Sequence, residues 1–125
     1  MMRVLFLSAA LLASTVSALA EDAIPEPTQK ADVHYRLFRS KNTYTLLKLD
    51  TRTGRVWQVQ WGVDQQHRFV VPINLKELAQ GGKTGRFTLY PTPNIYTFVL
   101  LDQEDGRAWQ VQWGDENDRF IVPVE

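Results

Sequence analysis

The amino-acid sequence predicts an all-β domain: about eight antiparallel strands in two tandem four-strand repeats, arranged as a sandwich or a partly closed barrel, with one short connecting helix. Three observations support this prediction. Residues 35–62 align with residues 87–114 at a constant offset of 52 positions, so the chain contains an internal duplication. Stretches rich in Tyr, Leu, Val, Trp and Phe alternate with short polar turns in both copies. The 125 residues include no cysteine, which leaves packing rather than disulfides to stabilise the fold.

The N-terminal residues are typical of an exported protein. Residues 1–20 predict a signal peptide, because a basic residue precedes a short apolar run and Ala20 ends an A-x-A cleavage site. Residues 21–33 carry prolines among polar side chains, which predicts a flexible tether. Cleavage would place the protein in the periplasm or outside a Gram-negative type of cell, with no membrane span. The single β domain, residues 34–125, then has three parts: repeat one at 34–73, a connector at 74–82 and repeat two at 83–125.

The balance of charges limits the class of partner. The chain has 14 basic and 14 acidic side chains, and loss of the signal peptide removes one arginine, Arg3. The mature chain would therefore carry 13 basic against 14 acidic side chains, a net charge of −1. Nucleic-acid binding rests on a strong positive field, so we expect no nucleic-acid partner.

Each repeat is expected to contain four strands joined by turns. The expected strands are 35–38, 43–49, 55–61 and 68–73 in repeat one, and 87–90, 95–101, 107–113 and 119–124 in repeat two. The turn between the second and third strand has an Asp at its start and a Gly at its end, which favours a hairpin. These turn-forming residues are Asp50 and Gly54, and their counterparts Asp102 and Gly106. Pro72 and Pro123 occupy matching places in the fourth strands, which predicts edge positions or strand ends, because proline cannot donate to a ladder.

The connector, residues 74–82, predicts a helix of one to two turns. Asn74 is a suitable N-cap, Glu77 occupies the third helical position, and glycines follow the last helix former. Each repeat of about 40 residues is near the size below which a domain needs disulfides, metals or association. We therefore expect the two repeats to share one core, related by a pseudo-twofold axis.

The motif WQVQW occurs once in each repeat and alternates two kinds of side chain. Along a strand, successive side chains point to opposite faces, so the tryptophans share one face and the glutamines the other. We expect the tryptophan faces to point inward, because four buried indoles contribute roughly 15–25 kcal/mol of gross burial. The alternative is an exposed platform that stacks on sugar rings or anchors a protein partner. The tryptophans are Trp57, Trp61, Trp109 and Trp113.

The glutamine face has two interpretations. The glutamine side chains form either a ladder where related strands of the two repeats meet, or a polar binding surface with Arg55 and Arg107 at its margin. These arginines could equally be solvated caps at strand ends. The glutamines are Gln58, Gln60, Gln110 and Gln112.

Catalytic chemistry has little support in the sequence. Ser40 is the only serine after the signal peptide and lies in an expected turn without a nucleophile motif. His34 and His67 lack ligand-type spacing, and the acidic run 115–118 lacks the glycine and distal glutamate of a calcium loop. We expect no catalytic residue, no metal and no cofactor.

The pattern L-D-x-x-x-G-R-x-W-Q-V-Q-W, repeated at 49–61 and 101–113, resembles that of a group of small exported bacterial proteins that are uncharacterised. This resemblance implies a secreted β-rich repeat protein and no catalytic residues. The hairpin L-D-x-x-x-G-x-x-W is also similar to the blades of quinoprotein-type β-propellers. Because propellers need four or more blades, two copies can close a ring only if several chains assemble.

The expected function is binding. The sequence predicts an exported, non-enzymatic interaction module for a protein or glycan of the cell envelope, a periplasmic inhibitor being one form. It would use the glutamine face or the loops after Trp61 and Trp113. One alternative is a glycan-active enzyme with carboxylates from both repeats, such as Asp64 and Asp115. The other is a structural envelope protein that self-associates. Partner identity and oligomeric state stay open.

Overall fold

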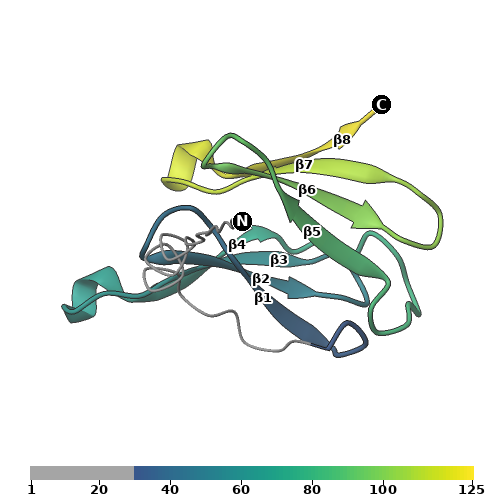
Figure 1. The fold of residues 1–125 in the computed structure, drawn as a ribbon, viewed down its shortest axis with the longest axis horizontal. Coiled ribbons are helices and arrows are strands. Elements are labelled where there is room, and N and C mark those ends of the chain that lie inside the picture. The colour runs from purple at the N-terminus through teal and green to yellow at the C-terminus, as the bar shows by residue number, and fades with distance from the viewer. Residues whose placement is uncertain (1–29) are drawn as a thin grey trace, which may run out of the picture.

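The structure, a computed structural model, describes residues 30–125 and consists of two four-stranded antiparallel sheets (Figure 1). The strands follow one another in chain order within each sheet, and each sheet corresponds to one of the two predicted four-strand repeats. Sheet one contains β1 (Tyr35–Arg39), β2 (Thr45–Asp50), β3 (Val56–Gln60) and β4 (Phe69–Asn74). Sheet two contains β5 (Phe87–Pro91), β6 (Thr97–Asp102), β7 (Ala108–Gln112) and β8 (Phe120–Val124). The all-β prediction is confirmed, with stacked sheets and no closed barrel.

Two single 3-10 turns are the only helical elements among the described residues. They are η1 (Gln65–His67), which joins β3 to β4, and η2 (Glu116–Asp118), which joins β7 to β8. Both lie at the same end of the molecule, at the left of Figure 1. The predicted signal peptide and residues 21–29 of the predicted tether lie outside the described residues. At the end of the tether, the Val33 carbonyl accepts a hydrogen bond from the Thr51 hydroxyl, so the folded unit includes Val33.

The core lies between the sheets, where β2 faces β5 and β4 faces β8. Sheet one contributes Leu47, Leu49 and Val56, and sheet two contributes larger side chains that include Phe98 and Trp109. Antiparallel register places directly opposed residues on the same face, which explains how these side chains gather. The expectation of one core shared by the two repeats is therefore confirmed.

The repeats stack front to back, which corrects the expected pseudo-twofold arrangement. The inner face of sheet two carries Trp109 and Val111, whereas the equivalent Trp57 and Val59 lie on the outer face of sheet one. The inner face of sheet one instead carries Leu47, Leu49 and Gln58. The two inner faces are thus opposite faces of the same repeat. The physical reason is complementary packing. The large indole rings of sheet two pack against the smaller aliphatic side chains of sheet one, whereas two facing layers of indole rings would not fit together as closely.

The connector forms no helix, which corrects the prediction for 74–82. The Asn74 side chain accepts from the Lys76 backbone N–H (3.0 Å) and donates to the Gly54 carbonyl (3.1 Å). The Leu78 backbone N–H donates to the Thr53 carbonyl (2.7 Å). Because the hairpin turn of repeat one accepts hydrogen bonds from Asn74 and Leu78, the connector is held against that turn instead of forming a helix.

The strand edges carry prolines. Pro72 lies in β4 and Pro123 in β8, and each of these strands is the last in its sheet. Pro91 ends β5, the first strand of sheet two. The predicted edge positions of Pro72 and Pro123 are confirmed.

Candidate functional site

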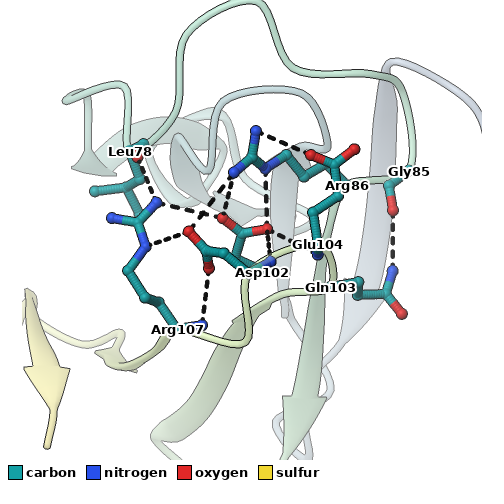
Figure 2. Close-up of polar contacts among 8 residues, drawn as sticks. Leu78, Gly85, Arg86, Asp102, Gln103, Glu104 and Arg107 are labelled. Carbon is teal, nitrogen blue, oxygen red and sulfur yellow. Dashed lines mark hydrogen bonds and ion pairs between the residues drawn. The ribbon is translucent and has the colours of Figure 1, made fainter.

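The hairpin turn of repeat two is organised by one buried carboxylate, that of Asp102 (Figure 2). Arg86 donates through Nε to Oδ1 and through Nη2 to Oδ2, both at 2.9 Å. Arg107 Nη2 lies 3.3 Å from Oδ2, and the Glu104 backbone N–H donates to Oδ1 (3.0 Å). Burial alone would raise the pKa of Asp102, but these hydrogen bonds, chiefly from Arg86, lower the pKa to about 2. Asp102 is therefore a carboxylate held ionised by its structural partners.

Asp50 has the same role in repeat one. Its carboxylate is fully buried and accepts from Arg55 Nη2 (3.0 Å), while His34 Nε2 lies 3.2 Å from Oδ1. Burial raises the pKa, but hydrogen bonds from the Arg52 backbone and from Arg55 outweigh it and lower the pKa of Asp50. Each turn closes with a glycine in the left-handed region, Gly54 at φ 84° and Gly106 at φ 83°.

The predicted arginines and glutamines lie apart. Arg55 and Arg107 bind the turn carboxylates at one end of the hairpins, whereas Thr45 pairs with Gln60 at the other end of β2 and β3. The structure therefore does not bring the arginines to the margin of a glutamine surface.

The glutamines of the two repeats occupy different environments. Gln58 is 3% exposed between the sheets, and its Oε1 accepts from the Gly114 backbone N–H (3.0 Å). Gln60 is on the same inner face and accepts from the Thr45 hydroxyl (3.1 Å). Gln110 and Gln112 lie on the outer face of sheet two and are half-buried. Repeat one thus places both glutamines on its inner face, and repeat two places neither of them there.

The tryptophans divide the same way. Trp109 and Trp113 are 6% exposed and belong to the core, whereas Trp57 is half-buried and Trp61 is 46% exposed. The inward orientation is confirmed for repeat two and wrong for repeat one. The last tryptophan of each WQVQW motif makes the same hydrogen bond in both repeats. Trp113 Nε1 donates to the Ile95 carbonyl and Trp61 Nε1 to the Thr43 carbonyl, each at 3.0 Å.

A polar cleft opens between the sheets at the end that carries η1 and η2. Its volume is about 680 Å³. Residues of repeat one line one wall, and residues of repeat two, chiefly those of the loop after Trp113, line the other. The first wall includes Asn42, Thr45, Gln58, Gln60 and Phe69; the second includes Tyr96, Gln112, Trp113, Asp115, Glu116, Asp118 and Arg119.

The cleft combines amides, carboxylates and aromatic rings. Asp115, Glu116 and Asp118 are exposed, and Arg119 donates through Nη1 to the Gly114 carbonyl (2.9 Å). Three carboxylates against one guanidinium give this wall an acidic character. The arrangement can donate and accept hydrogen bonds to hydroxyl and amide groups of a ligand, and the aromatic rings can pack against its apolar surfaces.

Other candidate groups lie outside this cleft. Asp64 lines a separate cavity of about 310 Å³ beside Trp61, so the structure does not place it with Asp115. The Ser40 hydroxyl donates to the Thr45 carbonyl (2.6 Å) within the turn after β1. Across residues 30–125, no set of three His, Asp or Glu side chains is placed to hold a metal ion. That same part of the chain contains no helix with the length and apolarity needed to cross a membrane.

Comparison with known proteins yields no match to a family model, to a curated protein or to a solved structure.

The sequence reasoning missed two features. Arg86, the main partner of Asp102, occupies the position equivalent to His34, one residue before the first strand of each repeat. A basic residue at matching places was the signal that could have found it. The cleft had no sequence signal, because its two walls are brought together only by the way in which the two sheets stack.

Proposed function

We propose that this protein is an exported, non-enzymatic binding module of the cell envelope and that the cleft between its repeats receives a segment of glycan. The observation that carries the proposal is the lining of the cleft: amide side chains on one wall, carboxylates on the other, and exposed aromatic residues at Phe69 and Tyr96. Its volume of about 680 Å³ falls within the range typical of small-ligand sites.

The distribution of carboxylates favours binding over hydrolysis. Asp115, Glu116 and Asp118 all belong to the single loop that contains η2, and the facing wall offers amides and hydroxyls instead. Glycoside hydrolysis generally needs two carboxyl groups that flank the scissile bond from opposite sides. A ligand in this cleft would therefore be held by hydrogen bonds without a facing acid and base.

The experiment is a calorimetric titration of the mature chain with defined oligosaccharides: neutral glucans, N-acetylated amino-sugar chains and, as a contrast, a basic peptide. Gln60→Ala should weaken glycan binding by about 3- to 10-fold, the effect of removing one hydrogen-bonding group. Gln110→Ala is the matched control, because this half-buried glutamine lies on the outer face of sheet two and does not line the cleft.

Three results would contradict the proposal. Binding that is equally sensitive to both glutamine substitutions places the ligand outside the cleft. Selective, salt-sensitive binding of the basic peptide identifies a protein partner on the acidic wall instead of a glycan. Cleavage of an oligosaccharide that is lost in Asp115→Asn would make the protein an enzyme.

A further inference from the structure

Each sheet has an outer face that no other element of residues 30–125 covers, and both faces expose apolar side chains. On sheet one, Trp61 is 46% and Val70 53% exposed; on sheet two, Val122 is 43% exposed. We call the outer face of sheet one the tryptophan face: Leu46, Lys48, Trp57, Val59, Trp61 and Val70. The outer face of sheet two is the glutamine face: Val99, Leu101, Ala108, Gln110, Gln112 and Val122. Exposed apolar patches of this kind mark interaction surfaces.

The interface between sheet one and sheet two shows which kind of surface packs against each face. Sheet two buries its own copy of the tryptophan face, with Trp109 and Val111, against the copy of the glutamine face on sheet one, with Leu47, Leu49 and Gln58. The duplication therefore leaves two faces without a partner: the tryptophan face on the outside of sheet one and the glutamine face on the outside of sheet two.

The interface between the two repeats includes one polar contact, and the residues equivalent to its two partners lie at the outer faces. Gln58 Oε1 accepts from the Gly114 backbone N–H at 3.0 Å. The equivalent residues are Gln110 on the glutamine face and Gly62 beside Trp61, and both are half-buried. A second chain stacked in the same orientation would place Gly62 of one chain opposite Gln110 of the other.

We propose that the partner of both outer faces is a second copy of this chain, with the tryptophan face of one copy on the glutamine face of the next. Such a contact is heterologous, since two different surfaces meet. A heterologous contact produces a ring if the rotation between copies closes, and an open filament if it does not.

One residue of the tryptophan face weakens this contact relative to the internal one. Lys48 replaces the fully buried Leu100 of repeat two, and its Nζ lies 4.6 Å from the centre of the Trp57 ring. Association must remove water from this ammonium group, which costs free energy. The copies therefore associate less tightly than the two repeats pack, and Lys48→Leu should strengthen association by at least about tenfold.

The test is sedimentation velocity over a concentration series with the chain from Glu21 onwards. Val70→Glu blocks the tryptophan face, and Val122→Glu blocks the glutamine face. Both valines are exposed, so their substitution should leave the unfolding midpoint unchanged. Val63→Glu is the matched control, because Val63 is 88% exposed in the loop after β3 and belongs to neither face.

The proposal predicts association of the wild type and of Val63→Glu, and monomers of each blocked variant alone. An equimolar mixture of the two blocked variants should form a heterodimer and nothing larger, because each supplies the face that the other lacks. Three outcomes overturn the proposal: a wild-type chain that stays monomeric at every concentration, association that Val70→Glu leaves intact, or a mixture that forms no heterodimer.

Discussion

Replacing the buried Asp102 by asparagine should destabilise the protein in a pH-dependent way. Asp102 is fully buried and bound by Arg86 and Arg107. Each pKa unit between the folded and unfolded chain corresponds to about 1.4 kcal/mol, so lowering the pKa from 3.8 to about 2 stabilises the folded chain by roughly 2 kcal/mol. Removing one partner of a buried ion pair costs about 3–5 kcal/mol. Because Glu104 and Asp105 still lie beside Arg86, we expect a loss of about 2–4 kcal/mol at pH 7.

The sign of the pH dependence follows from the lowered pKa. The contribution of Asp102 to the free energy of unfolding is complete above the unfolded pKa of 3.8 and is lost as the pH falls towards about 2. The difference in stability between the wild type and Asp102→Asn should therefore be constant from pH 7 to pH 5 and should shrink by roughly 2 kcal/mol between about pH 5 and pH 2.

The assay is urea unfolding followed by tryptophan fluorescence at several pH values. Asp105→Asn is the matched control from the same turn, because its carboxylate is 39% exposed and an exposed ion pair contributes less than about 1 kcal/mol. A difference between wild type and Asp102→Asn that does not change between pH 5 and pH 2 would refute the reasoning. If Asp102→Asn does not fold at all, the acid unfolding of the wild type and of Asp105→Asn still tests the predicted pH range.

Three further predictions concern packing. Trp113→Ala should lower the free energy of unfolding by about 3–5 kcal/mol, and Trp61→Ala by less than about 1 kcal/mol, in urea titrations; equal losses would contradict their different burial. Trp61→Phe should remove most of the emission that acrylamide quenches, and an unchanged quenching constant would place the exposed indole elsewhere. Gly82→Ala should cost more than about 2 kcal/mol, because a Cβ there would lie 2.1 Å from the Arg52 carbonyl oxygen. Gly81→Ala meets no atom within 4 Å and should lose only about 1 kcal/mol for its positive φ, so equal effects would contradict the clash.

The local parts of the fold could be predicted from the sequence because their signals are local. Strand alternation placed each WQVQW motif on a strand with its tryptophans on one face, and the Asp and Gly residues located the hairpin turns. The helix prediction for 74–82 failed because Asn74 and Leu78 find hydrogen-bond partners in the turn of repeat one, a tertiary contact that propensity does not contain.

The relative orientation of the repeats could not be predicted from the motif alone. Both copies of WQVQW are identical, yet Trp113 is buried and Trp61 is exposed. The difference depends on which face of the neighbouring sheet each copy meets. A weak signal existed in the second strand, where Lys48 in repeat one is replaced by Leu100 in repeat two. The cleft depends on this orientation, and it was therefore beyond sequence reasoning as well.

The prolines at the sheet edges affect how this protein resists misassembly. A proline in β4, β5 and β8 removes a backbone donor from three of the four outermost strands, so a foreign strand cannot continue the ladder there without a gap. Lateral growth into amyloid-like ribbons is thereby disfavoured, even at high protein concentration.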